Sequence, residues 1–167
     1  STPLSDGAST VLLGSEEWAK EHDLKVLAHF VDAETAAVDY VDKKEGLLMA
    51  PAYGIARLLA RHDLTFDDIA LWEIHEAFAA QLLAHVAALT SAAFLRDRVR
   101  IDNAFGAFPM DRVNPNGGSV ALGHPFGATG ARILSQAVKE LAARPAGTRA
   151  IVSICADGGQ GTVALLE

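Results

Sequence analysis

The sequence predicts an α/β fold in which helices cover a mixed sheet. Along the 167 residues, segments typical of strands alternate with segments whose apolar residues recur at helical spacing. Only a short glycine-rich turn separates the last two predicted strands, which favours an antiparallel pair. The chain length fits one ordinary domain.

The first part of the chain is predicted to run strand, helix, strand and loop. Residues 8–13 form a short apolar run and are expected to be a strand, after which Ser15 caps a helix that runs to about Glu21. Residues 24–31 mix Val, Leu and Phe, which predicts a second strand. The acidic and irregular residues 32–46 are expected to form a surface loop.

The middle of the chain contains two predicted helices and a buried strand. Pro51 suits the first position of a helix that ends near His62. Residues 70–74 have the composition of a buried strand, and a helix is expected to open directly after it at His75. Residues 93–101 are amphipathic and carry three arginines, and we assign them no element.

The stretch 114–132 organises the second half of the chain. It begins as a turn, because Asn-Pro-Asn-Gly-Gly is rich in residues that tolerate left-handed backbone or preset φ. After Gly130, apolar residues return at helical spacing up to about Ala143. Residues 150–154 and 162–166 are predicted to be the two final strands, with the glycine-rich turn between them.

Composition and charge exclude several classes of protein. The net charge of −7 argues against a nucleic-acid partner, because phosphate contacts need clustered Lys and Arg. No apolar run reaches the roughly 18 residues of a membrane span. The histidines lack metal-ligand spacing, so we expect no metal. The single cysteine, Cys155, excludes an internal disulfide and indicates a reducing compartment, which we expect to be cytoplasmic.

The start of the chain has no initiator methionine and no signal-like apolar core. Its first residues, Ser-Thr-Pro-Leu-Ser-Asp-Gly, are typical of the middle of a structured protein. We therefore expect a processed chain or a piece of a longer one.

His124 is the first candidate for chemistry. It precedes a proline, which disfavours helical backbone, so His124 is expected to be extended on a loop ahead of a helix N-terminus. The positive end of a helix disfavours a second positive charge, so the imidazole is expected to stay neutral. The alternative is a plain turn that happens to carry a polar residue.

His75, His124 and Cys155 all stand near predicted strand ends, where α/β proteins collect reactive side chains. A thiol with one or two histidines is a workable set of nucleophile and acid/base groups. The glycines after Cys155 could offer backbone N–H groups to an oxyanion. The alternatives are an inert buried thiol at 155 and a helix-capping histidine at 75. The glycines after His124 do not match a dinucleotide-binding fingerprint.

Four blocks of this sequence resemble the C-terminal half of a thiolase, in matching order and spacing. The blocks are Pro3-Leu-Ser-Asp-Gly-Ala8, Trp72-Glu-Ile-His-Glu-Ala-Phe-Ala-Ala-Gln81, Asn114-Pro-Asn-Gly-Gly-Ser-Val-Ala-Leu-Gly-His-Pro-Phe-Gly-Ala-Thr-Gly-Ala-Arg132 and Cys155-Ala-Asp-Gly-Gly-Gln-Gly161. The resemblance covers essentially the whole chain. It implies half of a layered αβαβα architecture, with residues 1–23 ending the N-terminal half and residues 24–167 forming the C-terminal domain.

The resemblance also implies a reaction. Thiolases interconvert a 3-ketoacyl-CoA plus CoA with acetyl-CoA plus a shortened acyl-CoA through an acyl-cysteine, and CoA is a substrate rather than a resident cofactor. By similarity, His124 activates the nucleophile and helps to polarise a thioester oxygen. Cys155 resembles the second cysteine, which moves the proton at the carbon α to the thioester.

The resemblance further implies roles for smaller groups and for partners. The backbone N–H groups of Asp157 and Gly158 are expected to face an oxyanion, and Ala77 and Phe78 are expected to contact CoA. The expected partners are acyl-CoA and CoA, the missing N-terminal half, and a second copy of the full-length protein in a homo-oligomer.

Two departures from the family pattern stand in the site. His75 replaces a common Asn, and this form resembles the trifunctional-type, fatty-acid-degrading branch of the family. Asp157 stands where Gly or Ala is common, and its carboxylate is an unfavourable neighbour for an enolate unless it points away.

The acylated cysteine of the family has no counterpart among these residues, so we expect this chain alone to be inactive. Two alternatives stay open. One is a piece of a ketoacyl synthase-like condensing enzyme, which Cys155 and its glycines disfavour. The other is a non-catalytic binding module derived from a thiolase, which the intact histidines disfavour.

Overall fold

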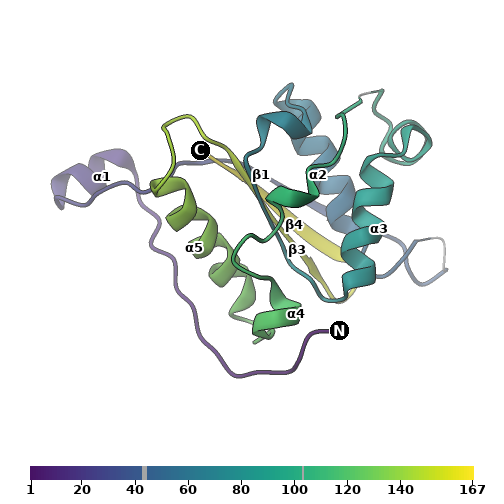
Figure 1. The fold of residues 1–167 in the computed structure, drawn as a ribbon, viewed down its shortest axis with the longest axis horizontal. Coiled ribbons are helices and arrows are strands. Elements are labelled where there is room, and N and C mark those ends of the chain that lie inside the picture. Colours follow the sequence, from purple (N-terminus) through teal and green to yellow (C-terminus); the bar gives the residue numbers. More distant parts are fainter. Residues whose placement is uncertain (43–44, 103) are drawn as a thin grey trace.

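The computed structural model describes residues 1–42, 45–102 and 104–167. One sheet runs through the molecule with helices on both of its faces. The N-terminal arm, residues 1–14, extends along one side (Figure 1). Within those described ranges, no helix is long and apolar enough to cross a membrane.

The sheet has four strands, β1 (Phe30–Ala37), β2 (Leu71–Ile74), β3 (Ala150–Ala156) and β4 (Gln160–Leu166), in the order β1-β4-β3-β2. The β2–β3 pair is parallel and the other two pairs are antiparallel. The predicted mixed sheet and the predicted antiparallel hairpin at the end of the chain are therefore both confirmed.

Two hydrophobic cores lie on opposite faces of the sheet. The larger lies beneath α2 (Ala50–Arg61) and α3 (Ala79–Leu89), and the smaller lies beneath α5 (Thr129–Ala142). The strands supply alternate residues to each core, as a pleated strand must. On β3, Ile151 faces the larger core and Val152 the smaller one.

Shorter elements connect these layers. They are α1 (Glu16–Glu21), the 3₁₀ turns η1 (Phe66–Asp68) and η3 (Met110–Arg112), the π-helix η2 (Phe94–Val99), and α4 (Ser119–Leu122). As predicted, Ser15 caps α1, because its hydroxyl accepts from the Trp18 N–H at 3.1 Å.

Two strand predictions for the first forty residues are wrong. Residues 8–13 are extended and belong to no strand, and β1 begins at Phe30 rather than at residue 24. The predicted loop 32–46 therefore contains most of β1. Residues 43 and 44 of that loop lie outside the described residues.

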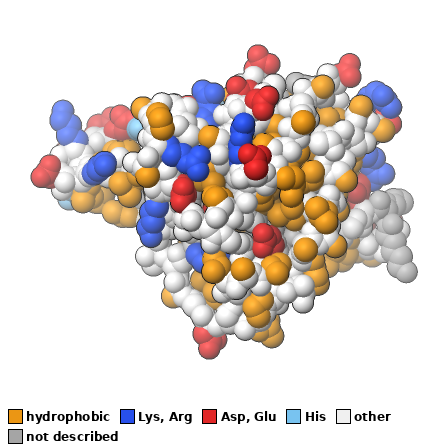
Figure 2. All heavy atoms as spheres, in the orientation of Figure 1, with side chains coloured by type: hydrophobic (Ala, Val, Ile, Leu, Met, Phe, Trp, Pro, Cys, Tyr) orange, Lys and Arg blue, Asp and Glu red, His pale blue; other side chains and the backbone are white. Residues whose placement is uncertain are grey.

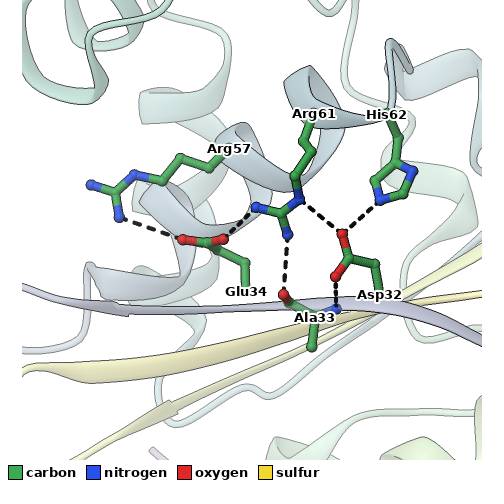
Figure 3. A network of polar contacts seen from close by, with 6 residues as sticks. All are labelled: Asp32, Ala33, Glu34, Arg57, Arg61 and His62. Carbon is green, nitrogen blue, oxygen red and sulfur yellow. Dashed lines mark hydrogen bonds and ion pairs between the residues drawn. The ribbon is translucent and has the colours of Figure 1, made fainter.

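The strand was missed because β1 turns charges toward a helix instead of an apolar face. Figure 3 shows Asp32 and Glu34 of β1 reaching toward α2. Arg61 of α2 donates to Asp32 Oδ2 at 2.8 Å and to Glu34 Oε2 at 2.6 Å. Arg57 and His62 complete this network. A search for apolar runs does not find a strand that is held in this way.

Three further differences concern the loops that carry the site. The helix expected to open at His75 begins at Ala79, and residues 75–78 form an irregular connection. Residues 94–99, to which we assigned nothing, form the π-helix η2. The short helix α4 lies inside the central stretch, where only a turn was predicted.

Candidate functional site

His75 sits at the end of β2 and is held there by the sheet. Its backbone N–H donates to the Ser153 carbonyl at 2.8 Å, which continues the parallel β2–β3 pairing by one residue. By strand alternation its side chain leaves the sheet on the α5 side, and only 1% of the residue is exposed.

His124 lies on the loop between α4 and α5 and is extended, as predicted. It forms an isolated parallel bridge with Leu4, and its N–H donates to the Pro3 carbonyl at 3.2 Å and to Ser5 Oγ at 3.0 Å. Gly123 before it has φ of 97°, which favours glycine. The N-terminal arm therefore fixes the backbone of the candidate histidine.

The two imidazoles are in contact. Their ring centroids lie 4.1 Å apart with an interplanar angle of 42°. Each ring also has a hydroxyl at Nδ1: Ser119 Oγ lies 2.9 Å from that atom of His75, and Thr129 Oγ1 lies 2.6 Å from that atom of His124. The fold thus joins two motifs that are far apart in the sequence into one polar cluster.

Both imidazoles favour the neutral form. Burial, followed by the nearby His124 and Arg132, lowers the pKa of His75 to about 4. Burial and then Arg132 lower the pKa of His124 as well. The direction agrees with the sequence-based expectation for His124, but the largest cause is desolvation rather than a helix terminus.

Cys155 stands near the end of β3, apart from both rings. It pairs directly with Gly161, which packs on Pro51 of α2, so the thiol leaves the sheet on the face opposite to His75. No hydrogen bond or ring contact joins its Sγ to His75 or His124, all of which the structure describes. Burial raises the pKa of this thiol to about 11.

β2 and β3 are parallel, so the thiol and the imidazoles nevertheless lie at the same end of the sheet, where the carboxyl ends of these two strands meet. The structure therefore brings the two imidazoles together and leaves the thiol on the other face of the sheet. A molecule bound across the carboxyl ends of β2 and β3 would have the two imidazoles on one side and the thiol on the other.

In the turn after Cys155, a side chain of the turn accepts a hydrogen bond from a backbone N–H of the same turn. Asp157 Oδ1 accepts from the Gly158 N–H at 2.8 Å, which occupies one of the two N–H groups expected to face an oxyanion. The Asp157 side chain is exposed. Gly159 has φ of 74°, and a Cβ there would lie 2.6 Å from the Val38 carbonyl, so this position requires glycine.

Ala77 and Phe78, the expected CoA contacts, lie on the connection between β2 and α3. Phe78 is 49% exposed. Gln81 Oε1 accepts from the Ala77 N–H at 3.1 Å, and the Gln81 amide in turn donates to His85. This connection is thus fixed from the first turn of α3, and an aromatic ring remains at the surface.

Sequence reasoning missed the residues that hold the central loop against the end of β2. Asn114 donates to Glu76 Oε1 at 2.7 Å, and Glu76 Oε2 accepts from the Val120 N–H at 3.1 Å. A Cβ at Gly118 would collide with the Glu76 carboxylate, so a larger residue there would displace this side chain from its hydrogen bonds. Asn114 has φ of 45°, a conformation that Asn tolerates better than most residues, and the signal in the sequence was an Asn at the start of a predicted turn.

The described residues contain no group of three or more His, Cys, Asp or Glu side chains that could hold a metal ion. On the face drawn in Figure 2, charged groups of both signs are interspersed among hydrophobic ones.

Comparison with known proteins identifies the class of protein to which this fold and histidine pair belong. The family model described as "Thiolase, C-terminal domain" matches residues 24–167. The chain therefore belongs to the thiolase family, which confirms the resemblance read from the sequence and leaves no place for the ketoacyl synthase alternative.

Named relatives agree with this assignment. The chain is 42% identical to the 3-ketoacyl-CoA thiolase of Aeromonas salmonicida (strain A449) over 166 residues, which is 99% of this chain and 37% of that protein. It therefore spans little more than a third of the length of this curated relative.

Two solved structures share the fold, which confirms the predicted thiolase-like class. The Acat5 thiolase from Ascaris suum, in complex with coenzyme A, matches with a TM-score of 0.66 and 34% identity over 92% of this chain and 34% of that one. The dimeric peroxisomal thiolase of Saccharomyces cerevisiae matches with a TM-score of 0.67 and 33% identity over 89% of this chain and 32% of that one.

Proposed function

We propose that this chain supplies the histidine-bearing half of the active site of a 3-ketoacyl-CoA thiolase. The reaction is acyl transfer between a 3-ketoacyl-CoA and CoA. The observation that carries the proposal is the contact between His75 and His124, which joins two thiolase-like motifs at one sheet edge. Relatives named 3-ketoacyl-CoA thiolase match nearly the whole chain and support this substrate class.

In this proposal His124 is the general base that takes the proton from the attacking thiol, and His75 donates a hydrogen bond to the thioester oxygen. Both roles require neutral imidazoles near pH 7, and the lowered pKa values of both groups meet that requirement. Cys155 acts as the acid, because a thiol whose pKa is about 11 keeps its proton until a carbanion takes it.

The acylated cysteine must come from outside these residues. Cys155 is the single cysteine of the chain, and it cannot be both acyl carrier and proton donor. The partner in this proposal is an N-terminal thiolase half, and the chain alone has no turnover. The full-length protein forms a homo-oligomer in this proposal, which the dimeric state of the peroxisomal thiolase of Saccharomyces cerevisiae supports.

CoA is the substrate, and Ala77 and Phe78 are its proposed contacts. The complex of the Ascaris suum thiolase with coenzyme A supports CoA as the ligand class. The Asp157 and Gly158 N–H groups stay the proposed oxyanion donors, and Gly158 serves only if Asp157 releases it. The lone cysteine supports a reducing compartment, and we place the protein in the cytoplasm.

The test is to restore the missing half. The cysteine-bearing N-terminal region of the Aeromonas relative is fused ahead of Ser1, and thiolysis of acetoacetyl-CoA by CoA is measured. The fusion should turn over and the chain alone should not. Replacing His124 by Ala in the fusion should lower kcat by about 10²–10⁴-fold, the usual contribution of a general base.

A folded fusion that binds CoA without turnover would favour the remaining alternative, a non-catalytic module. A His22→Gln variant is the control, because His22 is an exposed histidine at the end of α1 and lies outside the pair. Its Nδ1 lies 2.8 Å from the Trp18 carbonyl, and the variant should keep most of the activity.

A further inference from the structure

Two buried hydroxyls stand behind the histidine pair and have no role in the proposed function so far. Ser119 and Thr129 are both fully buried, and each lies at hydrogen-bond distance from Nδ1 of one imidazole. A neutral imidazole carries its proton on one ring nitrogen and accepts at the other. The hydroxyl at Nδ1 therefore decides what each ring offers at Nε2.

Ser119 has a constrained set of partners. Its Oγ accepts from Arg132 Nη2 at 3.4 Å, since a guanidinium can only donate. Among the described residues, the one other group within hydrogen-bond distance of Oγ is His75 Nδ1 at 2.9 Å. A buried hydroxyl proton needs an acceptor, so it goes to Nδ1. His75 then carries its own proton on Nε2.

Thr129 leads to the opposite result for His124. Its Oγ1 lies 3.2 Å from the Pro125 carbonyl, which can only accept, and we assign the hydroxyl proton to that oxygen, which also accepts from the Ala128 N–H at 2.9 Å and the Thr129 N–H at 3.1 Å. The contact between Oγ1 and His124 Nδ1, at 2.6 Å, is then a hydrogen bond only if Nδ1 carries a proton. His124 therefore has a free lone pair at Nε2.

We propose that Ser119 and Thr129 hold the touching imidazoles in opposite tautomers, so that His75 offers an N–H at Nε2 and His124 offers a lone pair. Ser119 and Thr129 are positioning residues, and Arg132 orients the Ser119 hydroxyl. This inference rests on the proposed function for its catalytic meaning.

The arrangement gives the site a donor and an acceptor side by side. Neither Nε2 atom has a hydrogen-bond partner among the described residues, so both are available to a bound molecule. When a thiol approaches, its S–H bond breaks and the proton moves to His124 Nε2, which leaves a thiolate and an imidazolium. The His75 N–H remains in place for a thioester oxygen.

The Arg132 cation also helps to keep both rings neutral. It lowers the pKa of each imidazole in addition to the effect of burial. Its own Nε is buried without a partner, so no carboxylate is bonded to that atom. The tautomers are therefore a meaningful property of this site at neutral pH.

The experiment is long-range ¹H–¹⁵N NMR of the 167-residue chain with ¹⁵N-labelled histidine, which distinguishes protonated from unprotonated ring nitrogens. His75→Gln and His124→Gln assign the two rings by loss of signals. In the unaltered chain, Nε2 of His75 and Nδ1 of His124 should be the protonated atoms. The same tautomer in both rings would overturn the proposal without any further substitution.

Variants then test the two hydroxyls. Thr129→Val should convert His124 to a mixture or to the Nε2–H form, and Thr129→Ser should restore Nδ1–H. Ser119→Ala should move the Nδ1 signal of His75 to that of a nitrogen without a donor. Thr90→Val is the matched control, because its hydroxyl bonds only helix carbonyls and neither ring should respond. An unchanged His124 spectrum in Thr129→Val contradicts the proposal.

Activity of the fusion separates this inference from the proposed function. Thr129→Val should lower kcat at least tenfold with little change in KM, and Thr129→Ser should recover it. Opposite tautomers in a fusion that has no turnover would leave the tautomers established and remove the proposed function. Turnover that is unaffected by Thr129→Val would remove Thr129 as a positioning residue.

Discussion

The side-chain amide of Asn114 pairs with both backbone polar groups of Ile74, accepting from its N–H at 2.8 Å and donating to its carbonyl at 2.9 Å. The Asn114 N–H also donates to the Trp72 carbonyl at 2.8 Å. β2 is an edge strand of the sheet, and Asn114 supplies hydrogen bonds to its outer side that a neighbouring strand would otherwise supply. His75 follows directly, which ties the position of the ring to Asn114.

Asn114→Gly should therefore destabilise the chain by roughly 2–4 kcal/mol, because the N–H and carbonyl of Ile74 lose their buried partners. Glycine accepts the positive φ at this position, so backbone strain cannot account for the loss. The measurement is the urea unfolding midpoint. Asn116→Gly on the exposed part of the same loop is the control, and equal effects at 114 and 116 would contradict the assignment.

Gly161→Ala should lower the free energy of unfolding by about 1–3 kcal/mol, the usual range for overpacking. A Cβ there would lie 2.6–2.7 Å from three atoms of Pro51, including its backbone nitrogen, so α2 would have to shift away from β4. Gly127→Ala is the matched control, since nothing lies within 4 Å of a Cβ at that position. The two midpoints are compared by urea denaturation, and similar values would refute the close packing of α2 on β4.

Cys155 should react slowly with iodoacetamide in the folded chain. Its pKa of about 11, against an ordinary 9.0, leaves about 100-fold less thiolate at pH 8. The alkylation rate of the folded chain should keep rising above pH 9.0, where an ordinary thiol is already half ionised. In urea the rate should equal that of an exposed cysteine. The measurement is mass-spectrometric alkylation kinetics, and equal rates in the folded and unfolded chain would show that the thiol is accessible and ionised.

Glu73 should make the chain less stable as the pH rises. Burial raises the pKa of this carboxyl from 4.5 to about 7, outweighing the opposite effect of Arg132. The stability it contributes is complete below pH 4.5 and is lost as the pH rises through 7, so about 2–3 kcal/mol is lost between pH 5 and pH 8. Glu73→Gln should remove that loss in urea titrations at the two pH values, and a variant that parallels the unaltered chain would contradict it.

His75 should act in the opposite direction. Its pKa falls from 6.5 to about 4 in the folded chain, so its contribution is present above 6.5 and is lost as the pH falls toward 4. Between pH 7 and pH 5 this amounts to about 2 kcal/mol. His75→Gln should flatten this part of the stability curve, whereas the exposed His22→Gln should leave it unchanged.

Much of the fold followed from residue patterns. The alternation of apolar runs and helical periodicity located β2, β3, β4, α2 and α5, and the short turn between the last strands gave their antiparallel pairing. β1 escaped because its inward residues are carboxylates whose partners lie on α2, and a single-sequence pattern does not show partners.

The site was predictable in part. His75 and His124 were singled out by their motifs, and the structure places their rings together. Sequence position did not reveal that Cys155 would leave the sheet on the other face, because that depends on strand register. Sequence reasoning did not single out Ser119 or Thr129, because their proximity to the rings arises only from the folded loop.

The carboxylates of β1 have one more consequence. β1 is the outer strand at the other end of the sheet, and among the described residues no further strand pairs with its free side. A foreign strand docking there would have to approach a row of charges already engaged by Arg57 and Arg61. Because charged side chains on an edge strand disfavour pairing with another strand, the network that holds β1 to α2 also works against edge-to-edge association of copies of this chain.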